Sequence, residues 1–247
     1  MVVAGLFGAL VGSFLNVVVH RLPARASLVT PRSRCPRCEA AIAPRDNVPV
    51  LSWLLLGGRC RHCRAAISAR YPLIELLTAL TFATVALVRG VDLELALELP
   101  FAAMLIAVAA IDLEHRIVPN RILAPAAVWA LGAGAMVRTG ELGELAVAGA
   151  AAFLCLLLAA LAHPGGMGMG DVKLAGVMGL YLGASVVPAL LVAFAAGSLV
   201  GIAMIAREGA GARKKGVPFA PFLALGGLAG LLAGPELLGL YVETFLR

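Results

Sequence analysis

The sequence predicts an all-α polytopic membrane protein with about eight transmembrane helices, its N-terminus outside, and a small zinc-bearing cytoplasmic segment. Of its 247 residues, 61% are hydrophobic and 14% are charged, and the mean hydropathy is +0.97. Soluble globular chains carry roughly 25% charged residues, and disordered chains are poorer still in apolar residues, so composition excludes both classes. Long uncharged windows and a lopsided distribution of basic residues complete the prediction.

Five windows with few or no charges are each long enough to cross ~30 Å of hydrocarbon. They lie at about 2–19, 72–88, 95–111, 122–137 and 145–161. Residues 174–206 carry no charge and would measure ~50 Å as one helix, so we divide this stretch near Gly183–Ser185, just before Pro188. Residues 217–234 supply the eighth span. The first window lacks the basic N-terminal region of a signal peptide, so we expect a retained helix rather than a cleaved signal peptide.

The basic residues set the predicted orientation, because loops rich in Lys and Arg stay cytoplasmic. With the N-terminus outside, 17 basic residues fall on the inner side and 3 on the outer side. The inner set is ten Arg in 20–71, then Arg116, Arg121, Lys173, Arg207, Arg213, Lys214 and Lys215; the outer set is Arg89, Arg138 and Arg247. A wrong helix count would scramble this split, so it supports eight spans as well.

Three parts follow from these boundaries: a first transmembrane helix at 1–19, a cytoplasmic zinc-binding segment at 20–71, and a seven-helix membrane part at 72–247. The middle segment holds four of the five cysteines, in two Cys-x-x-Cys pairs separated by 21 residues. The four are Cys35, Cys38, Cys60 and Cys63. Such spacing is typical of a closed, structural four-thiolate zinc site. Disulfides are the alternative, which the reducing cytoplasm disfavours.

Acidic residues that touch the membrane are functional candidates, because charge is expensive there. Asp112 stands at the predicted cytoplasmic end of the third span, and Asp171 closes the Gly-rich turn 168–171 on the same side. Two carboxyl groups that meet in a partly dry site share a proton, which suits acid/base hydrolysis without a covalent intermediate. A proton-coupled transporter also places acids in membranes, and it stays an alternative.

Seven motifs occur in order along the chain: residues 12–18 with 21–23, the two Cys pairs, 46–53, 70–75, Asp112 with Ile117 and Pro119, the Gly-x-Gly-Asp at 168–171, and 217–223. Together they resemble those of the type IV prepilin peptidases, the polytopic aspartic leader peptidases of pilus and type II secretion systems. The resemblance covers nearly the whole chain. Two mild departures are Asn120, where the family often has Asp, and Ala220, where it often has Gly.

The resemblance implies that Asp112 and Asp171 are catalytic and that the substrates are prepilins or pseudopilins. Their short cytoplasmic leader would be cut after a Gly, just before an apolar helix. It also implies a bacterial cytoplasmic (inner) membrane location, with the active site facing the cytoplasm and the lipid bilayer as a partner. Nucleic acid is not an expected partner, and the sequence does not indicate an oligomeric state.

Family members with the zinc-bearing segment often also methylate the new N-terminal amine with S-adenosylmethionine, so both activities are expected here. Glu75, at the cytoplasmic end of the second span, is the candidate cofactor-binding residue because it could balance the sulfonium cation or receive the amine's proton. The alternative for Glu75 is a carboxylate favoured by the helix dipole. A non-catalytic, zinc-anchored assembly factor is the other class that stays open.

Overall fold

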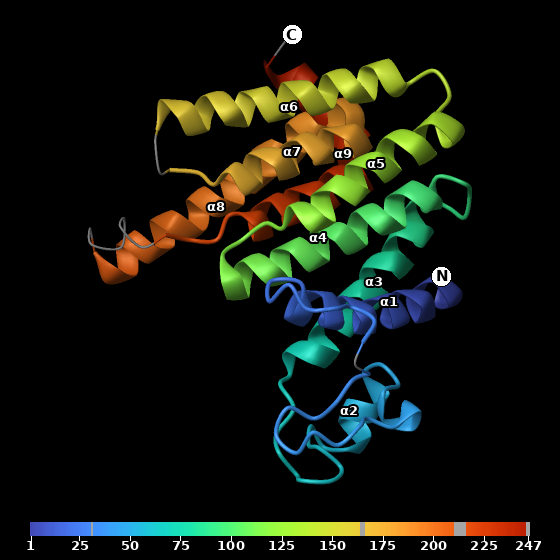
Figure 1. Cartoon of the computed structure of the whole chain (residues 1–247). Helices are drawn as coiled ribbons and strands as arrows, with labels where there is room; N and C mark the ends of the chain where they lie inside the picture. Colours follow the sequence, from blue (N-terminus) through green and yellow to red (C-terminus); the bar gives the residue numbers. More distant parts are fainter. Residues whose placement is uncertain (31, 164–165, 210–215, 246–247) are drawn as a thin grey trace. The chain divides into compact units, whose positions relative to one another are not determined.

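The computed structural model describes residues 1–30, 32–163, 166–209 and 216–245, and within these ranges its regular structure is helical (Figure 1). Contacts divide the chain into two compact units, Met1–Gly90 and Val91–Arg247. The first contains α1 (Val2–Arg21), η1 (Pro44–Asp46), α2 (Leu51–Leu55) and α3 (Arg70–Val88). The second contains α4 (Leu95–His115), α5 (Asn120–Val137), α6 (Leu142–Ala162), α7 (Met169–Leu182), η2 (Gly183–Ser185), α8 (Val186–Glu208) and α9 (Ala220–Phe245). The contacts thus group α3 with α1 rather than with the helices that follow.

Glycines bring α1 and α3 together in the first unit. A Cβ added at Gly12 would lie 2.7 Å from Cα of Glu75, and one at Gly8 would lie 2.7 Å from the carbonyl oxygen of Thr78. Small residues permit this close backbone approach, which is the usual basis of helix pairing in membranes. The pairing sets the polar residues of α1 beside the first turns of α3. Asn16, for example, donates its side-chain N–H to the carbonyl oxygen of Tyr71 at 3.0 Å.

The second unit is built around α4, the most deeply buried of its membrane-length helices. Phe101, Leu105 and Val108 on α4 are fully buried. Among the described residues, seven stretches are long and apolar enough to cross a membrane, and one of them is the 40-residue stretch Met169–Glu208. The predicted all-helical membrane fold is therefore confirmed.

The stretch Met169–Glu208 is two helices rather than one, because η2 interrupts it at the predicted Gly183–Ser185. Gly183 has φ +55°, a left-handed conformation that glycine adopts without strain. After this turn α8 runs antiparallel to α9, whereas α7 runs parallel to it, so the chain crosses the unit twice. The contacts that set these directions are Gly226–Ala189 and Gly234–Ser185 for α8, and Gly227–Met178 and Gly230–Leu182 for α7.

Among the described residues of the second unit, most of the basic side chains lie at one end. This end gathers the C-termini of α4, α6 and α8 and the N-termini of α5, α7 and α9 (Figure 1). Arg116, Arg121, Lys173 and Arg207 belong to these helix ends, whereas Arg138 lies at the opposite end, where it pairs with Glu94 at 3.2 Å. The predicted basic residues 213–215 and Arg247 lie outside the described residues. Charge is thus distributed as the predicted topology requires.

Candidate active site and metal centre

Asp112 lies in the last turn of α4, and its side chain is held by the start of another helix. The residue is 5% exposed, and its Oδ2 accepts the backbone N–H of Ala220 at 3.1 Å. Ala220 is the first residue of α9 and is fully buried. Free N–H groups and the helix dipole both favour a carboxylate at a helix N-terminus. The contact therefore fixes one oxygen of Asp112 and leaves the other for chemistry.

Asp171 occupies the first turn of α7, and it reaches back over the N-terminus of its own helix. Gly168 is the N-cap residue, and its backbone is the hydrogen-bond partner of the Asp171 carboxyl group. This is one half of a capping box, in which an acidic side chain at the third helical position satisfies the N-cap N–H. Asp171 is 9% exposed. Each aspartate is therefore positioned by a different helix N-terminus.

The two carboxyl groups belong to the same end of the second unit, and the charge of Asp112 acts on Asp171. Arg116, the left-handed residue that ends α4, is also within electrostatic range of Asp112. The structure thus brings together the two aspartates that the sequence singled out. Two neighbouring carboxyl groups in a largely dry site can divide the roles of acid and base between them.

Close packing explains why residue 170, just before Asp171, is a glycine. A Cβ added at Gly170 would lie 2.6 Å from Cβ of Val118, in the connection between α4 and α5. A Cβ at Gly168 would lie 3.3 Å from Oδ2 of Asp171. The sequence singled out this Gly-rich turn but did not indicate Val118 as its neighbour. Gly170 lets the start of α7 press against the segment that follows Asp112.

Gly170→Ala is therefore expected to reduce both stability and activity. Forcing a methyl group into this contact costs about 1–3 kcal/mol by the usual scale of overpacking. It would also move the Asp171 carboxyl group away from its position beside α4. Thermal unfolding in detergent and a leader-cleavage assay measure the two effects. Gly132→Ala on α5 is the control, because an added Cβ there meets nothing within 4 Å; equal behaviour of the two variants would contradict the packing argument.

The four cysteines of the segment between α1 and α3 converge, as the sequence predicted. Their sulfur atoms all lie within 4.8 Å of one another, with Cys35 and Cys63 at 3.7 Å and Cys38 and Cys60 at 4.0 Å. Four thiolates at ~2.3 Å from a tetrahedral zinc ion would be about 3.8 Å apart. The cysteines are not disulfide-bonded. The residues present therefore fit a four-sulfur metal centre.

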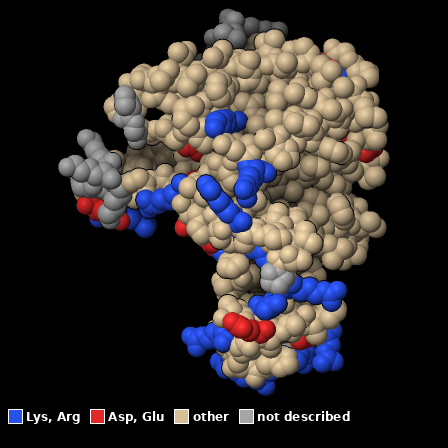
Figure 2. Space-filling model, in the orientation of Figure 1, with Lys and Arg blue, Asp and Glu red and all other residues tan. Residues whose placement is uncertain are grey.

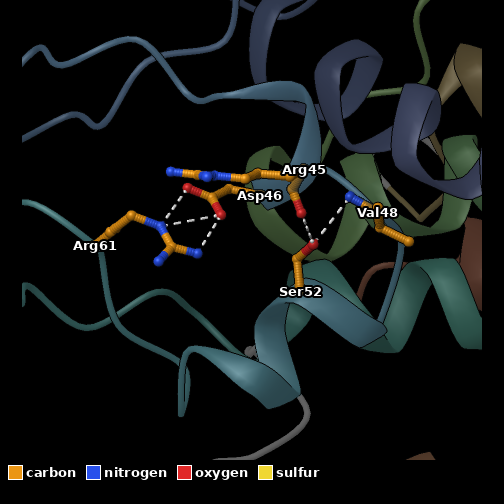
Figure 3. A network of polar contacts seen from close by, with 5 residues as sticks. All are labelled: Arg45, Asp46, Val48, Ser52 and Arg61. Atoms are coloured by element: carbon orange, nitrogen blue, oxygen red, sulfur yellow. Dashed lines mark hydrogen bonds and ion pairs between the residues drawn. The ribbon is translucent and has the colours of Figure 1, made fainter.

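The two Cys pairs have the same backbone geometry. In each pair the residue after the second cysteine adopts a positive φ, 55° for Glu39 and 59° for Arg64. The carbonyl oxygen of the first cysteine in each pair accepts the N–H of this positive-φ residue. The N–H of the same cysteine donates to the carbonyl oxygen of the next residue along, Ala40 at 3.0 Å in the first pair and Ala65 at 2.8 Å in the second. An ion pair of 2.6 Å between Asp46 and Arg61 joins η1 to the second Cys pair (Figure 3). The Arg61 guanidinium holds the pKa of the Asp46 carboxyl below its usual range.

The thiol groups are electrostatically prepared for a cation. Backbone N–H groups of Cys38 and Arg37 lower the pKa of Cys35 to about 6, and similar donors lower the pKa of Cys60. The backbone N–H of Ala40 lowers the pKa of Cys38, but local desolvation and its hydrogen bonds with the neighbouring cysteines outweigh that effect and raise the pKa to about 12. Four thiolates cannot coexist so close together without a positive ion between them, and a bound dication removes that obstacle.

Glu75 lies in the second turn of α3, in the first unit. It is 8% exposed, and its Oε2 accepts the backbone N–H of Val50 at 2.7 Å. Ser13 of α1 is its other partner. Both partners are neutral donors, so neither supplies a positive charge to the buried carboxylate. The sequence identified Glu75 but missed Ser13 and Val50 as its partners.

Val50 has an unusual backbone conformation. Its φ and ψ are 60° and −52°, and the N–H of Leu51 bonds the carbonyl oxygen of Pro49 at 2.5 Å. This is a γ-turn of the positive-φ kind, which is rare and strained, more so for a β-branched residue. The turn directs the N–H of Val50 toward Glu75. Local strain at this position is therefore linked to the placement of the Glu75 carboxylate.

Two family models match the chain. The model described as Bacterial Peptidase A24 N-terminal domain matches residues 6–88, and the model described as Type IV leader peptidase family matches residues 99–206. The chain belongs to the type IV leader peptidase family. The resemblance found in the sequence is thereby confirmed, and so is the prediction of a membrane peptidase.

Curated relatives of this leader peptidase are similar over nearly the whole length. A protein of Aeromonas salmonicida (strain A449), named prepilin leader peptidase/N-methyltransferase, is 36% identical over 98% of this chain and 93% of its own. A protein of the same name from Bacillus subtilis (strain 168) is 36% identical over 98% and 97%. One from Pseudomonas aeruginosa is 34% identical over 96% and 92%. No solved structure matches the chain.

Proposed function

We propose that this leader peptidase removes the short cytoplasmic leader of type IV prepilins or pseudopilins, cutting after a Gly, in the bacterial cytoplasmic membrane. The observation that carries the proposal is the placement of Asp112 and Asp171. Both carboxyl groups are buried at one end of the second unit, and each contacts a helix N-terminus. Membership in the family and the names of the relatives support prepilins as substrates.

The hydrolysis uses both carboxyl groups and one water molecule. The ionised aspartate takes a proton from the water as its oxygen attacks the carbonyl carbon of the scissile peptide bond, while the protonated aspartate donates its proton to the carbonyl oxygen. The tetrahedral intermediate then collapses. Its C–N bond breaks, the leaving amine takes the proton that the first aspartate accepted, and the hydroxyl proton returns to the second aspartate. The enzyme is restored without a covalent intermediate.

The charge distribution supports a cytoplasmic active site. The basic end of the second unit carries both aspartates, and the segment between α1 and α3 presents many arginines on its surface (Figure 2). Under the positive-inside rule both face the cytoplasm. A prepilin with its leader in the cytoplasm and its helix in lipid would meet such a site at the membrane boundary. A proton-coupled transporter is less well supported, because its acids would line a path across the membrane rather than share one end.

We further propose that the enzyme methylates the amine that cleavage frees. S-adenosylmethionine supplies the methyl group as a sulfonium cation. Glu75 would hold that cation or accept the proton of the attacking amine, because its partners Val50 and Ser13 leave its negative charge unbalanced. The name N-methyltransferase among the relatives supports this activity. The four cysteines would hold a zinc ion with a purely structural role, since a closed four-sulfur shell has no open position.

Product masses test both activities together. The purified protein is incubated with a prepilin and S-adenosylmethionine, and the pilin is analysed by mass spectrometry. The expected product lacks the leader and carries one added methyl group. An uncut prepilin would contradict the peptidase assignment, and a cut but unmethylated pilin would contradict the methyltransferase assignment alone. An assembly function in cells that tolerates loss of both aspartates would favour the non-catalytic, assembly-factor alternative.

Glu75→Gln is expected to reduce methylation and to leave cleavage nearly unchanged. The amide oxygen can still accept the N–H of Val50, so the local fold is preserved while the negative charge is lost. A hydrogen bond to a charged group contributes about 1.5–3 kcal/mol, which corresponds to a roughly 10- to 150-fold lower methylation rate. Rates of both steps are measured on one prepilin. If cleavage falls as severely as methylation in a folded variant, Glu75 belongs to the peptidase or to its packing.

A further inference from the structure

The short helix α2 presents an apolar face that its own segment does not bury. The exposed fractions are 45% for Val48, 52% for Leu51, 61% for Leu54 and 78% for Leu55. Spacings of three and four residues place Leu51, Leu54 and Leu55 along one side of α2, and Val48 precedes the helix. A cluster of four large apolar side chains is costly to expose to water. We therefore expect another apolar surface to cover these side chains.

Polar bonds hold the opposite side of α2 against the zinc-binding segment. Figure 3 shows the hydroxyl of Ser52 donating to the carbonyl oxygen of Arg45 at 2.9 Å and accepting the N–H of Val48 at 3.0 Å. The indole N–H of Trp53 donates to the carbonyl oxygen of Ile67 at 3.1 Å. In Figure 3 the Val48 side chain points away from the Asp46–Arg61 ion pair. These contacts fix which side of α2 faces outward.

The contact between Val50 and Glu75 sets the level of α2 along the membrane helix α3. Glu75 is the sixth residue of α3, so it lies about 7.5 Å along the axis from Arg70 at the helix start. Val50, at the N-cap of α2, donates directly to its side chain. Leu73 and Leu76 of α3, on either side of Glu75, are exposed in the way that lipid-facing side chains are. The leucines of α2 thus begin level with the first lipid-facing turns of α3.

We propose that α2 is an interfacial anchor, whose face of Leu51, Leu54 and Leu55, together with the preceding Val48, inserts into the lipid leaflet that surrounds the start of α3. Amphipathic helices with basic flanks bind in this way at the boundary of headgroups and acyl chains. The exposed Arg45 and Arg59 flank α2 and complement anionic headgroups. The zinc-binding segment is then attached to the membrane surface rather than suspended in the cytoplasm. The inference does not depend on the peptidase chemistry.

Fluorescence quenching by brominated lipids tests the anchor in the full-length protein. Leu55→Trp is reconstituted in nanodiscs of phosphatidylcholine and phosphatidylglycerol, with bromine at acyl carbons near the headgroup or with no bromine. The signal of the native Trp53 and Trp129 is subtracted with the wild-type protein. The expected result is a marked loss of the added fluorescence in brominated lipid. Because Leu55 is already exposed, the substitution does not disturb the core.

Ile42→Trp is the matched control, because Ile42 is an exposed apolar residue of the same segment outside the α2 face. It is expected to lose much less fluorescence. Equal fluorescence of Leu55→Trp with and without bromine would overturn the anchor. Equal quenching at positions 42 and 55 would overturn the assignment of the contact to α2. If the Trp at position 55 escapes quenching only in nanodiscs that hold two chains, the face contacts a second copy of the protein, and the proposed lipid anchor is overturned.

Discussion

Asp112→Asn and Asp171→Asn are each expected to abolish leader removal while the protein still inserts and folds. A carboxamide cannot exchange the proton that hydrolysis requires, and loss of a general acid or base lowers rates by roughly 10²–10⁴-fold. An asparagine side chain at position 112 could still accept the N–H of Ala220, so the start of α9 should be preserved. The cleavage rate of a prepilin at equal enzyme abundance measures the effect.

Asp92→Asn is the matched control for these variants. Asp92 is exposed and caps a turn by accepting the N–H of Glu94 at 2.9 Å, which an asparagine oxygen can also do. It should cut at the wild-type rate. The two catalytic-site variants should also fail to methylate an uncut prepilin, but they should methylate a pilin supplied already cut. Near-normal cleavage by either the Asp112 or the Asp171 variant would contradict the assignment of these two aspartates as the catalytic pair.

Cys38→Ser is expected to release zinc and to unfold the segment between α1 and α3. Apparent binding free energies for structural zinc sites are about 10–16 kcal/mol at neutral pH, which rivals the whole stability of a typical domain at ~5–15 kcal/mol. Trypsin should then cut at arginines between α1 and α3 that are protected in the wild type. Elemental analysis should find one zinc per wild-type chain and none in the variant.

Cys155→Ser provides the control, because Cys155 is the fifth cysteine and lies on α6 in the other unit. It should retain zinc and resist trypsin. The two aspartates proposed as catalytic belong to the second unit, so Cys38→Ser should lower cleavage through stability rather than through the chemical step. Wild-type protein that contains no zinc after purification without chelators would refute the metal assignment.

Some features of this protein follow directly from sequence because they depend on local properties. Hydrophobicity over about 20 residues sets each membrane helix, and the break at Gly183–Ser185 follows from a stretch too long for one crossing. Each Cys-x-x-Cys knuckle forms within six residues, and the convergence of the two knuckles was predictable because four thiolates at this spacing are typical of one tetrahedral zinc site. Asp112 and Asp171 could be identified from the sequence because acidic residues are rare in membrane helices.

Other features depend on contacts between distant residues, which no local pattern encodes. Asp112 is held by Ala220, 108 residues away, and the reason for Gly170 lies at Val118. The partner of Glu75 is the N–H of Val50, presented by a γ-turn that propensity would never assign to valine. Val50 and Ala220 lie within motifs of the family, but the amino-acid sequence alone indicated no role for either residue.

The central claim is that Asp112 and Asp171 together activate a water molecule against the scissile bond. A single turnover of prepilin in water labelled with ¹⁸O, read by the mass of the released leader, tests it most directly. Direct attack by water places one ¹⁸O atom in the new C-terminal carboxylate of the leader during the first turnover. A first-turnover leader without label, with ¹⁸O recovered in an aspartate of the enzyme, would mean that a carboxylate attacks the bond itself and would contradict the account.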